Sequence, residues 1–85
     1  MKVTLMGSHL CPDTLYAINK LCEAGVEMEF KNLSASLADL KAYLALRESS
    51  PLFDGPKARG SLGIPCFVLE DGTLTLDLEQ VLAAN

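Results

Sequence analysis

The chain has 85 residues, which is enough for one small domain with a single core and too few for a two-domain enzyme. Hydrophobic residues make up 49% of the chain, and this fraction excludes a disordered protein, which would be poorer in large apolar side chains. The 7 basic and 11 acidic side chains give a net charge of -4 without a Lys/Arg stripe, so we expect no nucleic-acid partner.

The N-terminus and the cysteines indicate the compartment. The apolar stretch near Met1 is too short for a signal peptide, and no run approaches the roughly 18 apolar residues of a membrane-spanning helix. We therefore expect a cytoplasmic protein with no membrane partner. The three cysteines, Cys11, Cys22 and Cys66, are an odd number without a Cys-x-x-Cys pair, so reduced thiols are expected rather than a disulfide scaffold.

The first segments predict a strand followed by a helix. The apolar run at 3–6, closed by Gly7, favours a buried strand. Pro12 suits the first position of a helix, and Gly25 suits its C-terminal stop. Between them apolar residues recur at three- and four-residue steps, which indicates one buried face made by Leu15, Ile18, Leu21 and Cys22.

The middle of the chain predicts a second strand and a second helix. Apolar and charged residues alternate over 26–31, which is typical of a strand with one buried face near a sheet edge. Ser36 and Asp39 resemble a capping box and predict a helix over 37–49. The segment 50–60 holds two prolines and two glycines, so we expect a loop with at most one or two helical turns.

The last segments predict a hairpin and a short helix. Apolar runs at 66–70 and 73–76 flank Asp71 and Gly72, and an Asp-Gly pair in this setting favours a type I′ hairpin turn. Asp77 then suits the N-cap of a final amphipathic helix.

These elements predict a single α/β domain over residues 1–85 in the order β-α-β-α-β-β-α. The first two strands are joined through a helix, so they should lie parallel by a right-handed crossover, whereas the hairpin adds antiparallel strands. The expected sheet is therefore mixed and four-stranded, with helices covering it.

Cys11 stands where the first strand passes to the first helix. Its sulfur would lie beside unpaired N–H groups at the positive end of the helix dipole, which favours the thiolate, the nucleophile of thiol–disulfide exchange. The carboxylate of Asp13 opposes this effect because it repels a neighbouring negative charge. The alternative is a cysteine that merely packs, since free cysteines are often buried.

The motif Cys11-Pro12-Asp13-Thr14, followed by Ile64-Pro65, a hairpin and a last helix, resembles the glutaredoxin branch of the thioredoxin fold over essentially the whole chain. The resemblance implies that Cys11 is the nucleophile and that Pro65 is cis and faces it. It also implies that Pro12 and Ile64 contact the substrate, with the Ile64 backbone pairing with a peptide such as glutathione.

The departures from that family narrow the mechanism. Thr14 replaces the second cysteine of dithiol glutaredoxins, so a monothiol route remains, in which Thr14 would hydrogen-bond the thiolate. Cys11 would then take glutathione from a glutathionylated or disulfide-bearing protein and pass it to a second glutathione. Ser8 stands where a lysine is common, and a Gly-Gly turn is missing before Asp77. The motif also differs from the Cys-Gly-Phe-Ser of iron–sulfur carriers, so we expect glutathione as a co-substrate and no bound cofactor or metal.

Other residues have weaker claims to the site. Asp77 is placed like the acidic residue that meets the γ-glutamyl amine in glutaredoxins, and it is equally suited to a plain N-cap. Lys57 and Arg59 lie on the segment before Ile64 and are candidates for a glutathione carboxylate, although loop charges are more often simply solvated. Cys66 is a possible resolving thiol if its strand position turns it towards Cys11.

Three competing interpretations remain. Cys22 is predicted to pack in the core and His9 to be exposed. Together with Cys11 and Cys66 they are a set of three cysteines and one histidine, the Cys3His inventory of a structural zinc site, but their spacing matches no zinc motif. A non-catalytic thioredoxin-fold binding or adaptor module is the main alternative to an enzyme. A glutathione transferase is disfavoured because the chain has no room for its second domain.

Overall fold

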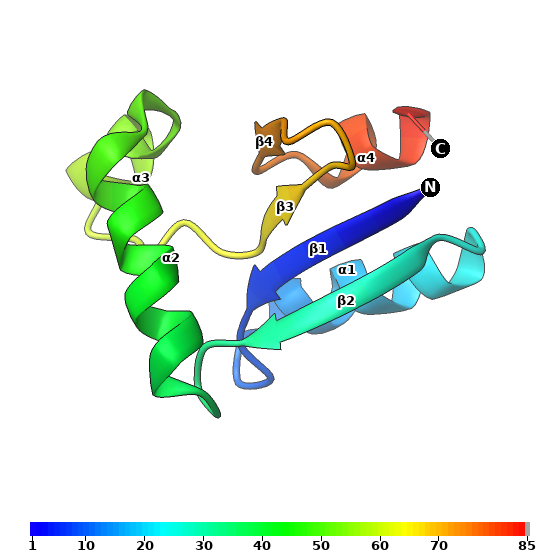
Figure 1. The fold of residues 1–85 in the computed structure, drawn as a ribbon, viewed down its shortest axis with the longest axis horizontal. Coiled ribbons are helices and arrows are strands. Elements are labelled where there is room, and N and C mark those ends of the chain that lie inside the picture. The colour runs from blue at the N-terminus through cyan, green and yellow to red at the C-terminus, as the bar shows by residue number, and fades with distance from the viewer. Residues whose placement is uncertain (85) are drawn as a thin grey trace.

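The computed structural model describes residues 1–84, which form an α/β fold with a four-stranded mixed sheet and four α-helices (Figure 1). A single 3-10 turn, η1, precedes α3. The elements are β1 (Lys2–Gly7), α1 (Pro12–Glu23), β2 (Glu27–Asn32), α2 (Leu37–Ser49), η1 (Pro51–Phe53), α3 (Asp54–Ala58), β3 (Cys66–Val68), β4 (Leu74–Thr75) and α4 (Leu78–Ala84).

The strand order is β2-β1-β3-β4. The predicted parallel pairing of the first two strands and the predicted antiparallel hairpin are both confirmed. β1 and β2 run parallel, with Lys2 opposite Glu27 and Gly7 opposite Asn32. β3 is antiparallel to both β1 and β4. β2 lies at one edge of the sheet, so its predicted edge position is confirmed.

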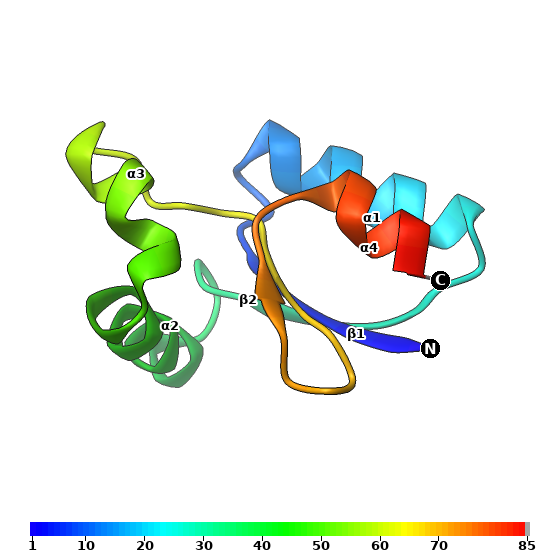
Figure 2. The ribbon, with the colours of Figure 1, turned by 90° about the horizontal axis from the view of Figure 1, so that it is seen from above.

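Two apolar clusters lie on opposite faces of the sheet. One packs β1 and β3 against α1 and α4, which lie side by side over one face (Figure 2), and its buried residues are Val3, Leu5, Ala17, Leu21, Val26, Phe67 and Val81. The other packs the opposite face against α2 and η1, and its buried residues are Met6, Leu33, Tyr43, Phe53 and Cys66. Side chains alternate along each strand, so Cys66 and Phe67 enter different clusters.

Helix α1 begins after Cys11, its N-cap residue, with Pro12 at the first helical position as predicted. Its buried residues are Thr14, Ala17 and Leu21, at helical spacing. The predicted apolar face is therefore rotated: Leu15 and Cys22 are exposed. The prediction that Cys22 packs in the core was wrong, because small Ala17 and polar Thr14 occupy the stripe against the sheet.

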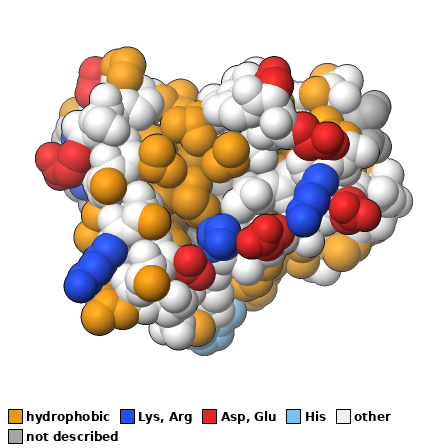
Figure 3. All heavy atoms as spheres, viewed as in Figure 1, with side chains coloured by type: hydrophobic (Ala, Val, Ile, Leu, Met, Phe, Trp, Pro, Cys, Tyr) orange, Lys and Arg blue, Asp and Glu red, His pale blue; other side chains and the backbone are white. Residues whose placement is uncertain are grey.

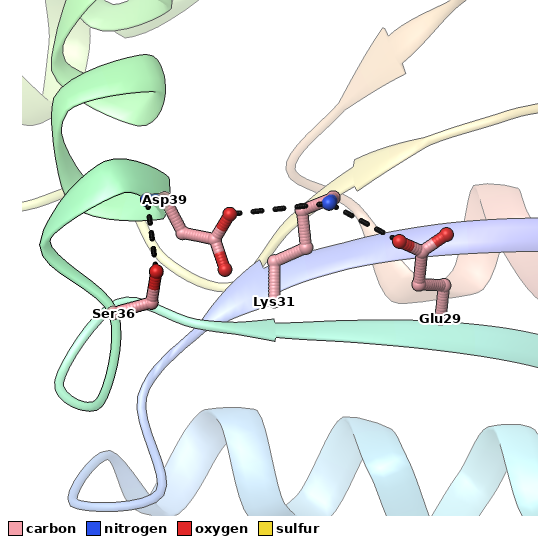
Figure 4. A network of polar contacts seen from close by, with 4 residues as sticks. All are labelled: Glu29, Lys31, Ser36 and Asp39. Carbon is pink, nitrogen blue, oxygen red and sulfur yellow. Dashed lines mark hydrogen bonds and ion pairs between the residues drawn. The ribbon is translucent and has the colours of Figure 1, made fainter.

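Helix α2 begins as the capping pattern predicts. The Ser36 Oγ accepts a hydrogen bond from the Asp39 N–H at 3.2 Å. Lys31 on β2 lies between two carboxylates, 3.1 Å from Glu29 and 3.9 Å from Asp39 (Figure 4). Hydrogen bonding and charge from Lys31 lower the pKa of Glu29, and Glu29 in turn raises the pKa of Lys31. This exposed network ties the start of α2 to the edge of the sheet.

The segment after α2 is more helical than a loop. Ser50 caps η1, its Oγ accepting from the Leu52 N–H at 3.3 Å, and α3 follows directly. Pro51 and Pro56 are tolerated because both stand within the first turns of these short helices. The prediction of at most one or two helical turns in this segment is confirmed.

The hairpin forms at the predicted place with a different turn. The Gly72 N–H donates to Leu69 O and the Leu69 N–H donates to Thr73 O, each at 2.9 Å, so three residues form the loop. A type I′ turn needs positive φ at two successive residues, but here only Gly72 has it, at 89°. The predicted type I′ turn was therefore wrong; the geometry is that of a three-residue loop closed by a left-handed glycine.

The sheet face opposite α1 carries two kinds of surface. Figure 3 shows acidic and basic side chains in a row across β1 and β2, and hydrophobic side chains gathered in the hollow between α2 and the strands β3 and β4. Within residues 1–84, no helix has the length and apolar character needed to cross a membrane.

Candidate functional site

Cys11 is half-buried at the point where β1 passes to α1. A tight turn brings it there, since the Cys11 N–H donates to Ser8 O at 3.0 Å and the Leu10 N–H donates to Ser8 Oγ at 3.0 Å. No side chain caps the N-terminus of α1 in this described region. The N–H groups of the first turn therefore receive no side-chain cap.

Thr14 is fully buried, and it fastens α1 to the end of β1. Its Oγ1 accepts a hydrogen bond from the Ser8 N–H at 3.3 Å. A Cβ placed on Gly7 would come within 2.6 Å of the same oxygen, so only glycine allows this close approach. Among the described residues, no hydrogen bond joins the Thr14 side chain to Cys11. The predicted thiolate contact is replaced by a structural one, because the Thr14 side chain turns towards β1.

The Ile64-Pro65 peptide bond is cis, as the family resemblance implies. Met6 pairs with Cys66 in the β1–β3 ladder, so the next step along both strands brings Pro65 opposite Gly7. Pro65 therefore lies at the same end of the sheet as the turn that holds Cys11. Both Ile64 and Pro65 are half-buried.

Two side chains of α2 hold the segment that leads to Ile64. The Tyr43 hydroxyl lies 2.7 Å from Leu62 O and 2.8 Å from Gly63 O. Arg47 donates to the backbone of the same segment, with Nη2 2.6 Å from Ser61 O and Nε 3.2 Å from Leu62 O. Sequence reasoning missed both residues: Tyr43 reads as an ordinary apolar helix position, and no local pattern marks the partner of its hydroxyl.

Gly63 completes this anchor. Its φ is 81°, and an added Cβ would lie 2.9 Å from the Phe53 ring and 3.2 Å from the Tyr43 hydroxyl oxygen. A side chain would therefore meet both backbone strain and a clash with two packed rings. The glycine before Ile64 was the available signal that this segment is tightly packed.

A groove of about 390 Å³ opens between α2, the turn after β1 and Ile64. Its walls are mostly apolar and consist of Leu33, Leu40, Leu44, Leu62 and Ile64. Ser8, Ser34 and Tyr43 supply the hydroxyl groups, and the Ser8 and Ser34 oxygens are hydrogen-bonded to each other.

Cys66 is fully buried, in the cluster on the α2 side of the sheet. Burial raises the pKa of its thiol from 9.0 to about 11. Helix α1, which begins directly after Cys11, packs on the opposite face. The predicted resolving role of Cys66 does not fit this position, because a buried, protonated thiol on the other face of the sheet is not a nucleophile for a disulfide at Cys11.

The charged candidates are dispersed. Asp77 caps α4, its Oδ1 accepting from the Glu79 N–H at 3.0 Å, which confirms the N-cap prediction and leaves substrate binding as a prediction. Lys57 lies on α3 and points its ammonium to Glu48 O at 3.5 Å. Arg59 follows α3 and is exposed. Neither cation belongs to the groove lining.

The four residues of the Cys3His inventory are dispersed in the fold. Among residues 1–84, no three His, Cys, Asp or Glu side chains gather closely enough to hold a metal ion. His9 is exposed, as predicted, and its Nδ1 lies 2.9 Å from Asn32 Nδ2. The three thiols occupy a helix start, an exposed helix position and a buried strand.

Comparison with known proteins adds one relative. An uncharacterized protein of Haemophilus influenzae is 39% identical over 80 residues, which cover 94% of this chain and 93% of that protein. This chain belongs to the same family. No family model matches the chain, and no solved structure matches it.

Membership in this family assigns no reaction, so the chemistry rests on the site. A half-exposed thiol at a helix start, a neighbouring cis-proline loop and an apolar groove lie together at one end of the sheet. Such a set can bind an extended peptide and present a nucleophile to it. No charged side chain lines the described groove.

Proposed function

We propose that this protein is a glutaredoxin-like thiol–disulfide oxidoreductase of thioredoxin fold, which exchanges disulfides through Cys11 alone. The observation that carries the proposal is the position of Cys11: half-exposed, at the uncapped start of α1, at the end of the sheet that also carries Ile64 and Pro65. The element order and the mixed sheet are compatible with that fold.

The reaction proceeds in two exchanges. The Cys11 thiolate attacks the glutathione sulfur of a protein–glutathione disulfide; a new disulfide forms, and the protein sulfur leaves as a thiolate that takes a proton from water. A second glutathione, as its thiolate, then attacks the glutathione sulfur held on Cys11. Oxidised glutathione leaves, and Cys11 returns to its starting state. Overall, the protein–glutathione disulfide and one reduced glutathione are converted into the protein thiol and oxidised glutathione.

The residues around Cys11 have distinct roles in this scheme. The start of α1 places backbone N–H groups next to Cys11, and Pro12 begins the helix without adding a further N–H donor. Thr14 holds the helix start against β1, while Tyr43 and Arg47 hold the Ile64 segment. The backbone of Ile64, just before β3, is suited to pairing with an extended substrate backbone.

The test uses Cys22 as an internal reference, because it is an exposed thiol near the opposite end of the same helix. We expect iodoacetamide at pH 7 to label Cys11 several-fold faster than Cys22, as followed by peptide mass spectrometry. Reduction of the glutathione mixed disulfide of 2-mercaptoethanol should be lost in Cys11→Ser and kept in Cys22→Ser.

Two results together would refute the enzyme. If iodoacetamide labels Cys11 no faster than Cys22, and the wild-type protein reduces no glutathione mixed disulfide, the proposed disulfide-exchange function is wrong. The alternative, a non-catalytic binding module that uses the Ile64 edge, would then be the better interpretation.

A further inference from the structure

The groove beside the Cys11 turn has a lining that disulfide exchange itself does not require. Five leucine and isoleucine side chains form its walls, and none of its lining residues is charged. Its volume of about 390 Å³ lies within the roughly 300–1,000 Å³ typical of ligand sites. Ser8 lines the groove and also accepts the Cys11 N–H, so the groove begins at the nucleophile's own turn.

The apolar surface continues outside the groove. Leu10, directly before Cys11, is 74% exposed, and Leu62 at the groove is 58% exposed. Leu44, on the α2 wall, is 41% exposed. Leu44 and Leu62 both belong to the groove lining, so the groove presents exposed apolar side chains to a ligand.

Charge decides which half of a protein–glutathione disulfide suits this surface. Glutathione carries two carboxylates, which are bound best by cations. The groove lining contains no Lys or Arg, Lys57 is turned to the end of α2, and Asp13 adds a negative charge beside Cys11. An apolar side chain of the protein half is the complementary occupant.

We infer that the groove binds a large apolar side chain, of leucine size, that flanks the reactive cysteine of a protein substrate. The inference rests on the proposed function and gives its substrate class: protein segments in which the glutathionylated cysteine has apolar neighbours. The exchange step is unchanged. Binding energy from the protein half brings its disulfide to Cys11, and glutathione alone is a poor ligand.

The experiment compares two short peptides, acetylated and amidated, that differ only at the two residues flanking a cysteine. One carries leucine at both places and the other serine, and each cysteine is a mixed disulfide with glutathione. We expect the wild-type protein to release the leucine peptide about ten-fold faster or more, because burial of a leucine side chain is worth at least that factor.

Matched variants locate the preference. Leu44→Glu adds a charge to the groove wall at a partly exposed position, and we expect it to abolish the preference for the leucine peptide over the serine peptide. Leu52→Glu is the control, because Leu52 is 37% exposed on η1 and does not line the groove. It should leave both rates unchanged, and circular dichroism should show that both variants fold.

The outcomes separate the two claims. Equal rates for both peptides in the wild-type protein would overturn the groove assignment and leave the exchange function intact. If neither peptide reacts, the exchange function fails, and NMR titration with the reduced peptides decides the groove on its own. Amide shifts at Ser34, Leu44 and Leu62 with the leucine peptide alone would support it, and equal or absent shifts would overturn it.

Discussion

At the scale of single residues, Tyr43 joins parts of the site that are distant in sequence. Its hydroxyl holds two carbonyl groups just before Ile64, and its ring packs edge-on against Phe53 at 5.7 Å between centroids. It also lines the groove. One buried side chain thus fixes the Ile64 segment, supports the α2 wall and closes the second apolar cluster.

Tyr43→Phe should therefore weaken the fold without changing its packing volume. The Leu62 carbonyl would keep its bond from Arg47, while the Gly63 carbonyl would lose its bond from the tyrosine in a buried place. We expect the free energy of unfolding to fall by about 1–3 kcal/mol in urea titrations. Tyr16→Phe is the control, since Tyr16 is 56% exposed, and it should change little. Equal losses in the two variants would contradict this account.

At the scale of elements, the sequence predicts what short-range patterns control. Ser36 and Asp39 mark the start of α2 because capping is decided within one turn, and the parallel β1–β2 pair follows from the helix between them. The sequence pattern assigns the wrong buried face to α1. Hydrophobicity favours Leu15 and Cys22, whereas the structure packs Thr14 against Gly7, the last residue of β1. Packing partners decide helix phase, and periodicity alone does not identify them.

The hairpin turn offers a prediction at this scale. Gly72 has a φ of 89°, and nothing lies within 4 Å of an added Cβ, so any cost of a side chain there is conformational. Gly72→Ala should destabilise the protein by about 1–2 kcal/mol, as measured by thermal unfolding. Gly72→Asn should recover part of the loss, because asparagine tolerates left-handed backbone.

Gly55→Ala is the matched control for that variant. Gly55 lies in α3, its φ is not positive, and an added Cβ would meet only the end of the flexible Arg59 side chain at 3.2 Å. Alanine should leave stability unchanged or raise it slightly, by about 0.5 kcal/mol. A loss at Gly55 as large as that at Gly72 would show that the cost at Gly72 is not specific to its backbone conformation.

At the scale of the whole molecule, the sheet separates two thiols that the sequence pattern allows to lie together. Cys66 follows Pro65 directly, yet it lies in the cluster under α2, whereas Cys11 caps α1 on the other side. Sequence alone did not decide between these sides, because one step of strand register reverses the face of every side chain. Lys57 lies on α3 and Arg59 directly follows it, outside the groove lining, so their contact with a glutathione carboxylate stays a prediction.

The buried thiol also links the stability of the whole fold to pH. Burial raises the pKa of Cys66 from 9.0 to about 11, so above pH 9 the unfolded chain loses this proton while the folded chain keeps it. The unfolded state then binds fewer protons, and the free energy of unfolding must fall as pH rises between 9 and 11. By pH 10 the loss from Cys66 should reach roughly 1 kcal/mol. Burial raises the pKa of the Tyr43 hydroxyl as well, which adds a loss of the same sign at higher pH.

Urea unfolding at pH 8, 9 and 10 under reducing conditions measures this effect. Cys66→Ala should lower stability at every pH by opening a small cavity in the second cluster, but its stability should decline less between pH 8 and 10 than that of the wild-type protein. Cys22→Ala removes an exposed thiol and should keep the wild-type decline. Parallel curves for the wild-type protein and Cys66→Ala would mean that Cys66 ionises alike in both states, and the buried position of this thiol would have to be revised.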